Sequence, residues 1–274
     1  MGKGVVSCFL IAFIISCTSI KEDRRECPCW FSVDFSKVSH DIENIHLWFF
    51  DEDGELLKRD TLSVPDYNNV YEIELKRGTV GFYVWGNISG DTEINKPFSR
   101  GASLKIVKDS SHADCLFRYS NLLDTSGEEG YDTVWMHKEH LNLEIVLEGG
   151  TVAGEEFFIQ LYCGTSGRYL DGGFTNTGNI VRTKLESKNG NYAANFRIWR
   201  QRSLEELKMS IFSKGTNSSC IVEEFRLGEY ILKSGYDMSE EELKDLKVLL
   251  DISSDRIIIE TDKWQIVMPV KIEL

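Results

Sequence analysis

Apolar and polar residues alternate along many short segments of this chain, and this spacing constrains its fold more than any other feature. Near the start, Phe31, Val33 and Phe35 alternate with Ser32 and Asp34. A two-residue period places all the apolar side chains on one face of a β-strand. The pattern recurs along the chain, with turn residues rich in Gly, Asn and Asp between the repeats. It predicts an all-β protein built of β-sandwiches.

We expect strands at residues 31–35, 45–50, 55–62, 71–75, 81–87, 104–107, 115–119, 141–147, 157–163, 180–185, 192–199, 208–212, 221–232, 257–260 and 264–274. The last of these has an apolar stripe that runs from Trp264 to Leu274, which predicts that the C-terminus packs into a sheet. One short helix is expected after Ser239, because Ser239 and Glu242 form a capping box ahead of Leu243, Leu246 and Leu250. The stretch around Leu207 stays ambiguous, because Ser203 with Glu206 could cap a short helix there instead of the strand expected at 208–212.

The length of 274 residues predicts two domains, since it exceeds what one hydrophobic core usually serves. The pattern breaks near residues 136–138 and then restarts. We therefore predict an N-terminal sandwich domain over residues 30–136 and a C-terminal sandwich domain over residues 137–274, with the helix in the second.

The N-terminus has the features of a bacterial lipoprotein signal peptide. Lys3 precedes an uncharged apolar run, Val5–Ile15, that is too short to span a bilayer. The run ends in Ile14-Ile15-Ser16-Cys17, which resembles a lipobox, where a small residue precedes a cysteine that receives the acyl chains. This predicts a signal peptide at residues 1–16, cleavage between Ser16 and Cys17, lipidation of Cys17, and a lipidated tether over residues 17–29. The alternative is an ordinary secretory peptide with a chance cysteine.

The charge of the chain restricts its partners. With a formal net charge of −13, the chain repels phosphate backbones, so nucleic acid is a poor partner. It also lacks the basic patch of peripheral membrane binders, so membrane attachment depends on the lipid. Lys21-Glu22-Asp23 resembles a signal that sends some Bacteroidetes lipoproteins to the outer face of the membrane, and a solvated linker explains it equally well.

The remaining cysteines do not predict a defined framework. They are odd in number, and the sequence does not determine which of them would pair as disulfides: Cys27, Cys29, Cys115, Cys163 and Cys220. Buried apolar thiols are the simplest interpretation.

Four segments, in order along the chain, resemble the fimbrillin-associated anchor lipoproteins of Bacteroidetes. They are the Cys-Pro-Cys segment and strand at 27–35, the strand and turn at 47–54, Arg77-Gly78 with the strand at 83–87, and the terminal pair at 257–259 and 264–267 preceded by 227–230. The resemblance implies two tandem transthyretin-like β-sandwich domains. It also implies a structural subunit that anchors a donor-strand-assembled fimbrium to the outer membrane and joins fimbrial shaft or accessory subunits by β-strand addition. Base and tip positions, and donor and acceptor roles, stay open.

No segment predicts an active site, a cofactor or a metal. Asp51-x-Asp53-Gly54 lacks the spacing of a calcium loop and is expected to be a hairpin turn. His137 and His140 lack zincin spacing and are expected in a surface linker. Gly164-Thr165-Ser166-Gly167 is a near miss for a nucleophile elbow and is expected to be a turn.

Two other functions remain. The first is a surface lipoprotein that binds glycans or proteins as an adhesin does, because six tryptophans and ten tyrosines could build stacking platforms. The second is an enzyme, and the sequence supports this function less well than the first.

Overall fold

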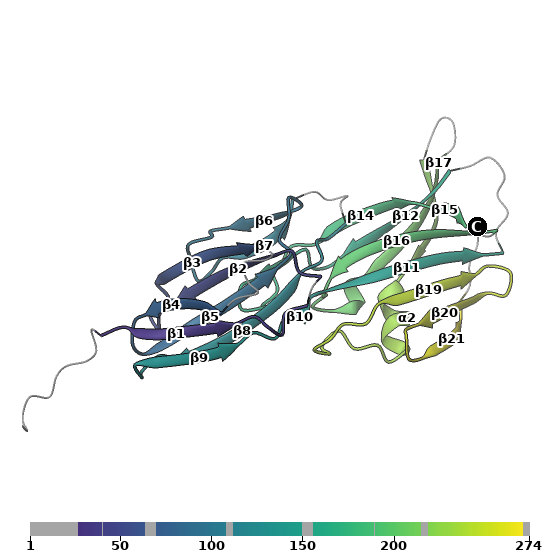
Figure 1. The fold of residues 1–274 in the computed structure, drawn as a ribbon. Coiled ribbons are helices and arrows are strands. Elements are labelled where there is room, and N and C mark those ends of the chain that lie inside the picture. The colour runs from purple at the N-terminus through teal and green to yellow at the C-terminus, as the bar shows by residue number, and fades with distance from the viewer. Residues whose placement is uncertain are drawn as a thin grey trace, which may run out of the picture.

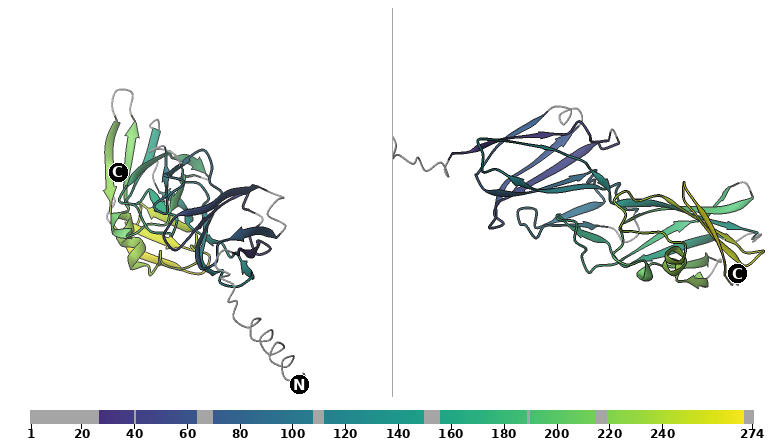
Figure 2. Two further views of the ribbon diagram at one scale, coloured as in Figure 1. Left: turned by 90° about the vertical axis from the view of Figure 1, so that its left-hand side faces the viewer. Right: turned by 90° about the horizontal axis from the view of Figure 1, so that it is seen from below.

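The computed structural model describes residues 27–39, 41–63, 70–107, 112–149, 156–188, 190–214 and 219–270. It consists of two β-sandwiches that follow one another along the long axis of the molecule (Figures 1 and 2). The described residues contain one α-helix, α2 (Leu227–Lys233), and one short 3-10 helix, η3 (Leu204–Glu206), both in the second sandwich. The predicted all-β class is confirmed.

The first sandwich pairs a three-stranded sheet with a five-stranded one. The three-stranded sheet has the order β4-β1-β9, formed by β1 (Cys29–Asp34), β4 (Tyr71–Leu75) and β9 (Glu129–Thr133). The five-stranded sheet has the order β10-β8-β5-β2-β3, formed by β2 (Asn44–Phe50), β3 (Leu56–Ser63), β5 (Thr79–Gly86), β8 (Phe117–Asp124) and β10 (His137–Lys138). Phe31 and Val33 face Phe49 and Phe82 in the core between them.

Strands β2 and β5 bury both of their faces, which explains their nearly continuous apolar sequences. One face joins the sandwich core, whereas Trp48 and Trp85 on the other belong to a second cluster. A small sheet of order β13-β7-β6 contributes to that cluster, with β6 (Thr92–Asn95), β7 (Ser103–Ile106) and β13 (Gly167–Tyr169). Because β13 comes from the second half of the chain, this sheet joins the two halves.

The second sandwich has a six-stranded sheet of order β15-β16-β11-β19-β20-β21 and a four-stranded sheet of order β14-β12-β17-β18. The first contains β11 (His140–Glu148), β15 (Glu186–Lys188), β16 (Asn191–Trp199), β19 (Leu246–Asp251), β20 (Arg256–Glu260) and β21 (Gln265–Pro269). The second contains β12 (Glu156–Cys163), β14 (Asn179–Lys184), β17 (Lys208–Lys214) and β18 (Ser219–Phe225). Their facing apolar side chains form one core, to which α2 contributes Leu227 and Ile231.

The helix expected after Ser239 is wrong. Residues 239–242 form a turn and bends, residues 243–245 are irregular, and β19 begins at Leu246. Ser239 donates its hydroxyl to Asp237 Oδ2 at 2.8 Å instead of capping a helix. The error has a simple cause: Leu246 and Leu250 are four residues apart, and that spacing shares one face in a helix and in a strand alike. Pairing of β19 with β11 and β20 decides the outcome.

The strand expected over residues 221–232 is correct only in its first part. β18 ends at Phe225, and the residues after it form α2. Leu227 and Ile231, four residues apart, are both buried on the core face of that helix. Gly228 allows the close approach of α2 to η3, because a Cβ there would collide with the backbone oxygen of Leu204. The ambiguity around Leu207 is resolved: Leu204–Glu206 forms η3, where Ser203 Oγ accepts from Glu205 N at 3.2 Å, and β17 begins at Lys208.

The C-terminal strand is an edge strand. Trp264 and Met268 pack against the core and Val270 is buried, as the stripe predicts. Ile266, however, is 38% exposed, since β21 pairs only with β20 among the described residues. The end of the stripe, Ile272 and Leu274, lies outside the described residues.

Candidate functional site

The predicted lipidation and cleavage residues, Cys17 and Ser16, lie outside the described residues. The described chain begins at Cys27, whose carbonyl oxygen accepts a hydrogen bond from Arg77 Nε at 3.0 Å. β1 follows at once and is the middle strand of its sheet, antiparallel to β4 and parallel to β9. A force applied at the N-terminus therefore acts on a strand that is held by backbone hydrogen bonds to a neighbouring strand on each side. No helix in the described part of the chain is long and apolar enough to cross a bilayer.

The described cysteine side chains are free thiols: Cys27, Cys29, Cys115 and Cys163. Cys29 and Cys163 are fully buried, and burial raises the pKa of the Cys163 thiol to about 12. These two behave as small apolar core residues, which agrees with the simplest interpretation of the sequence. The side chain of Cys220 is not among those described.

Of the other segments considered for chemistry, the hairpin turn is confirmed. Gly54 has a φ of +82° and donates its N–H to Asp51 O at 3.0 Å. Thr165 and Ser166 are buried in the connection between β12 and β13. The surface linker expected around the two histidines is wrong: His137 lies in β10, paired to β8, and His140 opens β11 with only 4% exposure. No group of metal-ligating side chains occurs within the described ranges.

The two sandwiches meet at an apolar junction. Leu170 and Trp199 from the second half pack in the cluster that contains Trp48 and Trp85. Trp85 Nε1 donates to Leu170 O at 3.1 Å, and Trp199 Nε1 donates to Asp114 O at 3.2 Å. Both bonds are buried and cross between the halves, so they fix the docking geometry as well as stabilising it.

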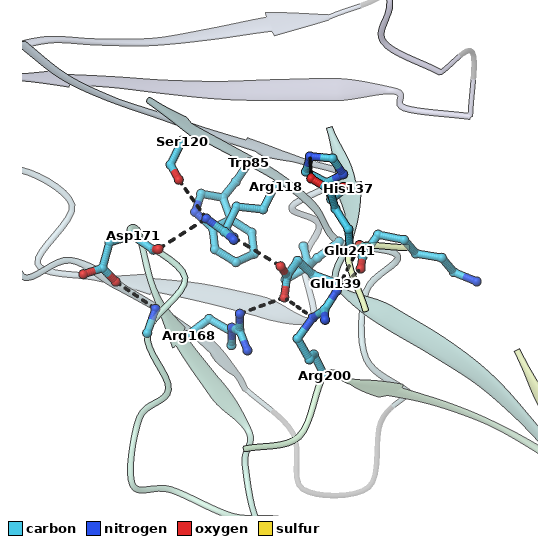
Figure 3. A network of polar contacts seen from close by, with 12 residues as sticks. Trp85, Arg118, Ser120, His137, Glu139, Arg168, Asp171, Arg200 and Glu241 are labelled. Carbon is cyan, nitrogen blue, oxygen red and sulfur yellow. Dashed lines mark hydrogen bonds and ion pairs between the residues drawn. The ribbon is translucent and has the colours of Figure 1, made fainter. Parts of the chain in front are cut away.

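Beside this junction, one buried carboxylate receives three guanidinium groups (Figure 3). Glu139, 2% exposed, lies between β10 and β11. Its Oε1 is 3.2 Å from Arg118 Nε, and its Oε2 is 2.8 Å from Arg168 Nη2 and 3.2 Å from Arg200 Nε. Burial lowers the pKa of Arg168 to about 10, which is still far above neutrality, so this guanidinium stays a cation.

The arginines reach the carboxylate from separate parts of the fold. Arg118 lies on β8, Arg168 on β13, and Arg200 directly after β16. Arg200 also donates to the carbonyl oxygens of Lys138, Met238, Glu240 and Glu241, which ties the turn after α2 to the junction. No local sequence pattern marks these residues, and sequence reasoning missed them because only the tertiary fold brings them together.

The exposed strand edges differ in how they resist pairing with other chains. β3 carries Lys58, Arg59 and Asp60, which is the usual protection of an edge. β21 carries no charged residue between Gln265 and Pro269, and Val267 on it is 52% exposed. Among the edge strands of the described residues, β21 is the one without a charged residue.

The outer face of the β4-β1-β9 sheet carries exposed aromatic side chains. Trp30 is 57% exposed and Tyr131 is 62% exposed, and together with Glu72 and Glu129 they line a shallow hollow of about 570 Å³. Tyr131 donates its hydroxyl to Asp34 Oδ2 at 2.9 Å, which fixes the ring. Such aromatic faces flanked by carboxylates suit the stacking and hydrogen bonding of sugars.

The chain was compared with known families and solved structures. The model of the fimbrillin-A associated anchor proteins Mfa1 and Mfa2 matches residues 25–267. The chain belongs to this family. The resemblance noted from the sequence is thereby confirmed, and the fimbrillin-A associated anchor proteins are structural proteins of fimbriae that act at the cell surface.

Solved structures agree in fold. The fimbrial anchor protein Mfa2 from Porphyromonas gingivalis is 14% identical, with a TM-score of 0.66 over 88% of this chain and 99% of that one. A candidate polysaccharide-binding protein from Bacteroides thetaiotaomicron is 12% identical, with a TM-score of 0.67 over 89% and 98%. A candidate adhesin from Bacteroides ovatus is 11% identical, with a TM-score of 0.66 over 91% and 97%. Comparison with curated protein sequences gave no significant match.

Proposed function

We propose that this chain is a structural lipoprotein that anchors a donor-strand-assembled fimbrium to the outer face of the bacterial outer membrane. The observation that carries the proposal is the anchor-protein family match over residues 25–267, directly downstream of the lipobox-like segment that ends at Cys17. Two or three acyl chains on one cysteine hold a protein far more firmly than a single chain does. The same proposal includes a signal peptide at residues 1–16, a lipidated tether at residues 17–29, and two sandwich domains at residues 30–136 and 137–274.

The central position of β1 supports an anchoring role. The tether leads straight into a strand flanked by two neighbours, so force applied through the lipid is spread over two rows of backbone hydrogen bonds. Fimbrial subunits would join at a strand edge, and β21 is the edge strand in the described part of the chain that lacks protecting charges.

Mass spectrometry of the N-terminal peptide from washed envelopes tests the anchor. We expect a peptide that begins at Cys17 and carries acyl chains, and a Cys17→Ala chain that is lost from the envelopes. Deleting the chain should release fimbriae into the medium or change their length. An unmodified, uncleaved N-terminus, or firm attachment of the Cys17→Ala chain, contradicts the proposal.

The strand edge is tested separately with Val267→Lys, which adds a charge to β21. Its matched control is Ile180→Lys on β14, an edge strand of the other sheet whose Ile180 is 41% exposed. We expect Val267→Lys to stay folded but to lose association with fimbrial subunits in size-exclusion chromatography, and Ile180→Lys to retain it. If the two altered chains associate equally with fimbrial subunits, β21 is excluded as the edge that binds those subunits.

A second function, binding of surface glycans, is favoured by the hollow beside Trp30 and Tyr131. A glycan array probed with the purified chain tests it. The control is Trp135→Ala, because Trp135 is similarly exposed at 56% and does not line the hollow. Saturable glycan binding that Trp30→Ala abolishes, and that Trp135→Ala leaves intact, supports a glycan site at this hollow. An array that shows no binding contradicts it.

A further inference from the structure

Strand β1 is paired in parallel with β9, and this pairing determines how the first sandwich responds to a pulling force. The register runs from Trp30 opposite Glu129 to Asp34 opposite Thr133. Both strands therefore point from the N-terminal end of the molecule towards the second sandwich, and Figure 1 shows them running along its long axis. On the other side of β1, β4 runs in the opposite direction.

The chain leaves β1 and β9 at opposite ends. The N-terminal residues precede β1, whereas β9 continues at its C-terminal end into β10 and the second sandwich. A pull between the N-terminus and the second sandwich therefore draws β1 one way and β9 the other, each along its own axis. The backbone hydrogen bonds between parallel strands are evenly spaced along the pair. Such a pull slides one strand past the other, so it acts on all of these bonds at once instead of breaking them one after another.

Hydrogen bonds at both ends of the pair oppose this sliding. Trp30 N donates to Glu128 O at 2.9 Å, and Val134 N donates to Asp34 O at 2.9 Å. The Tyr131 hydroxyl donates to Asp34 Oδ2 at 2.9 Å, so a side-chain bond also joins the two strands. Movement of β1 along β9 by one residue breaks all of these bonds.

Packing in the core opposes the sliding as well. Phe31 lies directly opposite Gly130 on β9, and its ring covers this glycine so closely that a Cβ there would collide with the ring. Phe31 and Val33 are both buried in the core of the first sandwich. Movement of β1 along its axis draws both side chains out of their places in that core, which the hydrophobic effect resists.

We propose that the β1–β9 pair is a mechanical clamp, which keeps the first sandwich folded while a fimbrium pulls against the lipid anchor. The source of the force rests on the proposed function, but the resistance is a property of the fold of the described chain. A force shared among all the bonds of the pair slows unfolding, and the unfolding rate governs how long a protein withstands a pull.

Single-molecule pulling by atomic force microscopy tests the clamp in two geometries. The chain from residue 17 onwards with Cys17→Ala contains every described residue and carries no lipid, and handles at its two ends reproduce the pull along β1 and β9. In the second geometry, one handle stays at the N-terminus and the other is attached to an azide-bearing residue in place of Lys76, which is exposed directly after β4. Because Leu75 lies opposite Cys29, this pull peels β1 away from its N-terminal end, bond after bond.

At equal pulling speed, we expect the first sandwich to unfold at a force at least about twofold higher between the two chain ends than between the N-terminus and residue 76. The length gained on unfolding identifies which sandwich has opened. Equal forces in the two geometries, or a lower force between the chain ends, overturn the clamp. Such a result leaves the proposed anchoring untouched, because the pulled chain carries no lipid. Conversely, an unmodified N-terminus in washed envelopes contradicts anchoring and leaves the measured forces unchanged.

Tyr131→Phe tests whether the β1–β9 pair is the part that resists. The substitution removes the hydroxyl that bonds Asp34 and keeps the ring. Tyr162→Phe is the control, because Tyr162 is 44% exposed and lies on β12 of the second sandwich. Under a constant force between the chain ends, the lifetime of the first sandwich should be at least about twofold shorter with Tyr131→Phe and unchanged with Tyr162→Phe. Equal lifetimes place the resistance outside the pair and refute the proposal.

Discussion

Arg168 Nη2 lies 2.8 Å from Glu139 Oε2, although β13 contributes the arginine and the segment between β10 and β11 contributes the glutamate. Both side chains are almost fully buried. The β13 strand pairs with β7 of the first half, so this ion pair lies where the two sandwiches are joined. The same carboxylate pairs with Arg118 of the first half, so Glu139 links the two halves.

Glu139→Gln should destabilise the chain strongly. The amide keeps the shape of the carboxylate but leaves three guanidinium groups without a buried counter-charge, and loss of one partner of a buried pair costs about 3–5 kcal/mol. The measurement is the free energy of unfolding by urea. Glu229→Gln is the control, because the Arg226–Glu229 pair is exposed and should contribute less than about 1 kcal/mol. Similar losses from the two substitutions would show that the junction does not depend on Glu139.

Gly228→Ala should destabilise the second sandwich. The added Cβ would collide with Leu204 O, a backbone atom that moves only if α2 and η3 separate. Overpacking of this kind typically costs about 1–3 kcal/mol. Gly90→Ala is the matched control, since nothing lies within 4 Å of a Cβ at that position. Thermal unfolding of both altered chains measures the effect, and an unchanged midpoint for Gly228→Ala would mean that the two helices are not held in contact.

Trp85→Phe should weaken the docking of the two halves. Phenylalanine fills most of the buried space but cannot donate to Leu170 O, which leaves a buried carbonyl short of a partner at a cost of about 1–3 kcal/mol. Trp30→Phe on the exposed face is the control and should change the unfolding free energy by less than about 0.5 kcal/mol. Limited proteolysis of residues 170–178, the segment after β13 that contains Leu170, provides a second readout, and resistance equal to that of the unaltered chain would argue against the junction bond.

Much of the fold was predictable from local patterns, because buried and exposed side chains alternate along most strands of a β-sandwich, and this alternation is visible in the sequence. The dense apolar runs of β2 and β5 were visible as strands, but that they bury both faces depends on the β13-β7-β6 sheet. The helix was misplaced, since Leu246 and Leu250 fit a helix and a strand equally while Leu227 and Ile231 lay inside an expected strand. The arginine cluster was invisible, because residues 118, 139, 168 and 200 share no spacing.

His140 should make the stability depend on pH. Its Nδ1 lies 3.1 Å from Leu116 O, which the neutral ring reaches by donating its N–H, and burial lowers its pKa to about 4. In the unfolded chain the pKa returns to its ordinary value of about 6.5. The stability contributed by the neutral ring is therefore complete above pH 6.5 and is lost as the pH falls towards 4, because the unfolded state binds the proton first. The shift corresponds to about 3 kcal/mol at the acid end.

Urea unfolding between pH 4.5 and pH 8.5 measures this dependence, with His140→Gln as a chain that cannot titrate at this position. Between pH 7 and pH 4.5, the unfolding free energy of the unaltered chain should fall by about 2 kcal/mol or more in excess of the fall in His140→Gln. Some acid dependence should persist in His140→Gln, because burial also lowers the pKa of His46 to about 4. Above pH 7 the two stability curves should run parallel, separated by the cost of the substitution alone. Parallel curves below pH 6.5 as well would mean that His140 is protonated equally in the folded and unfolded states.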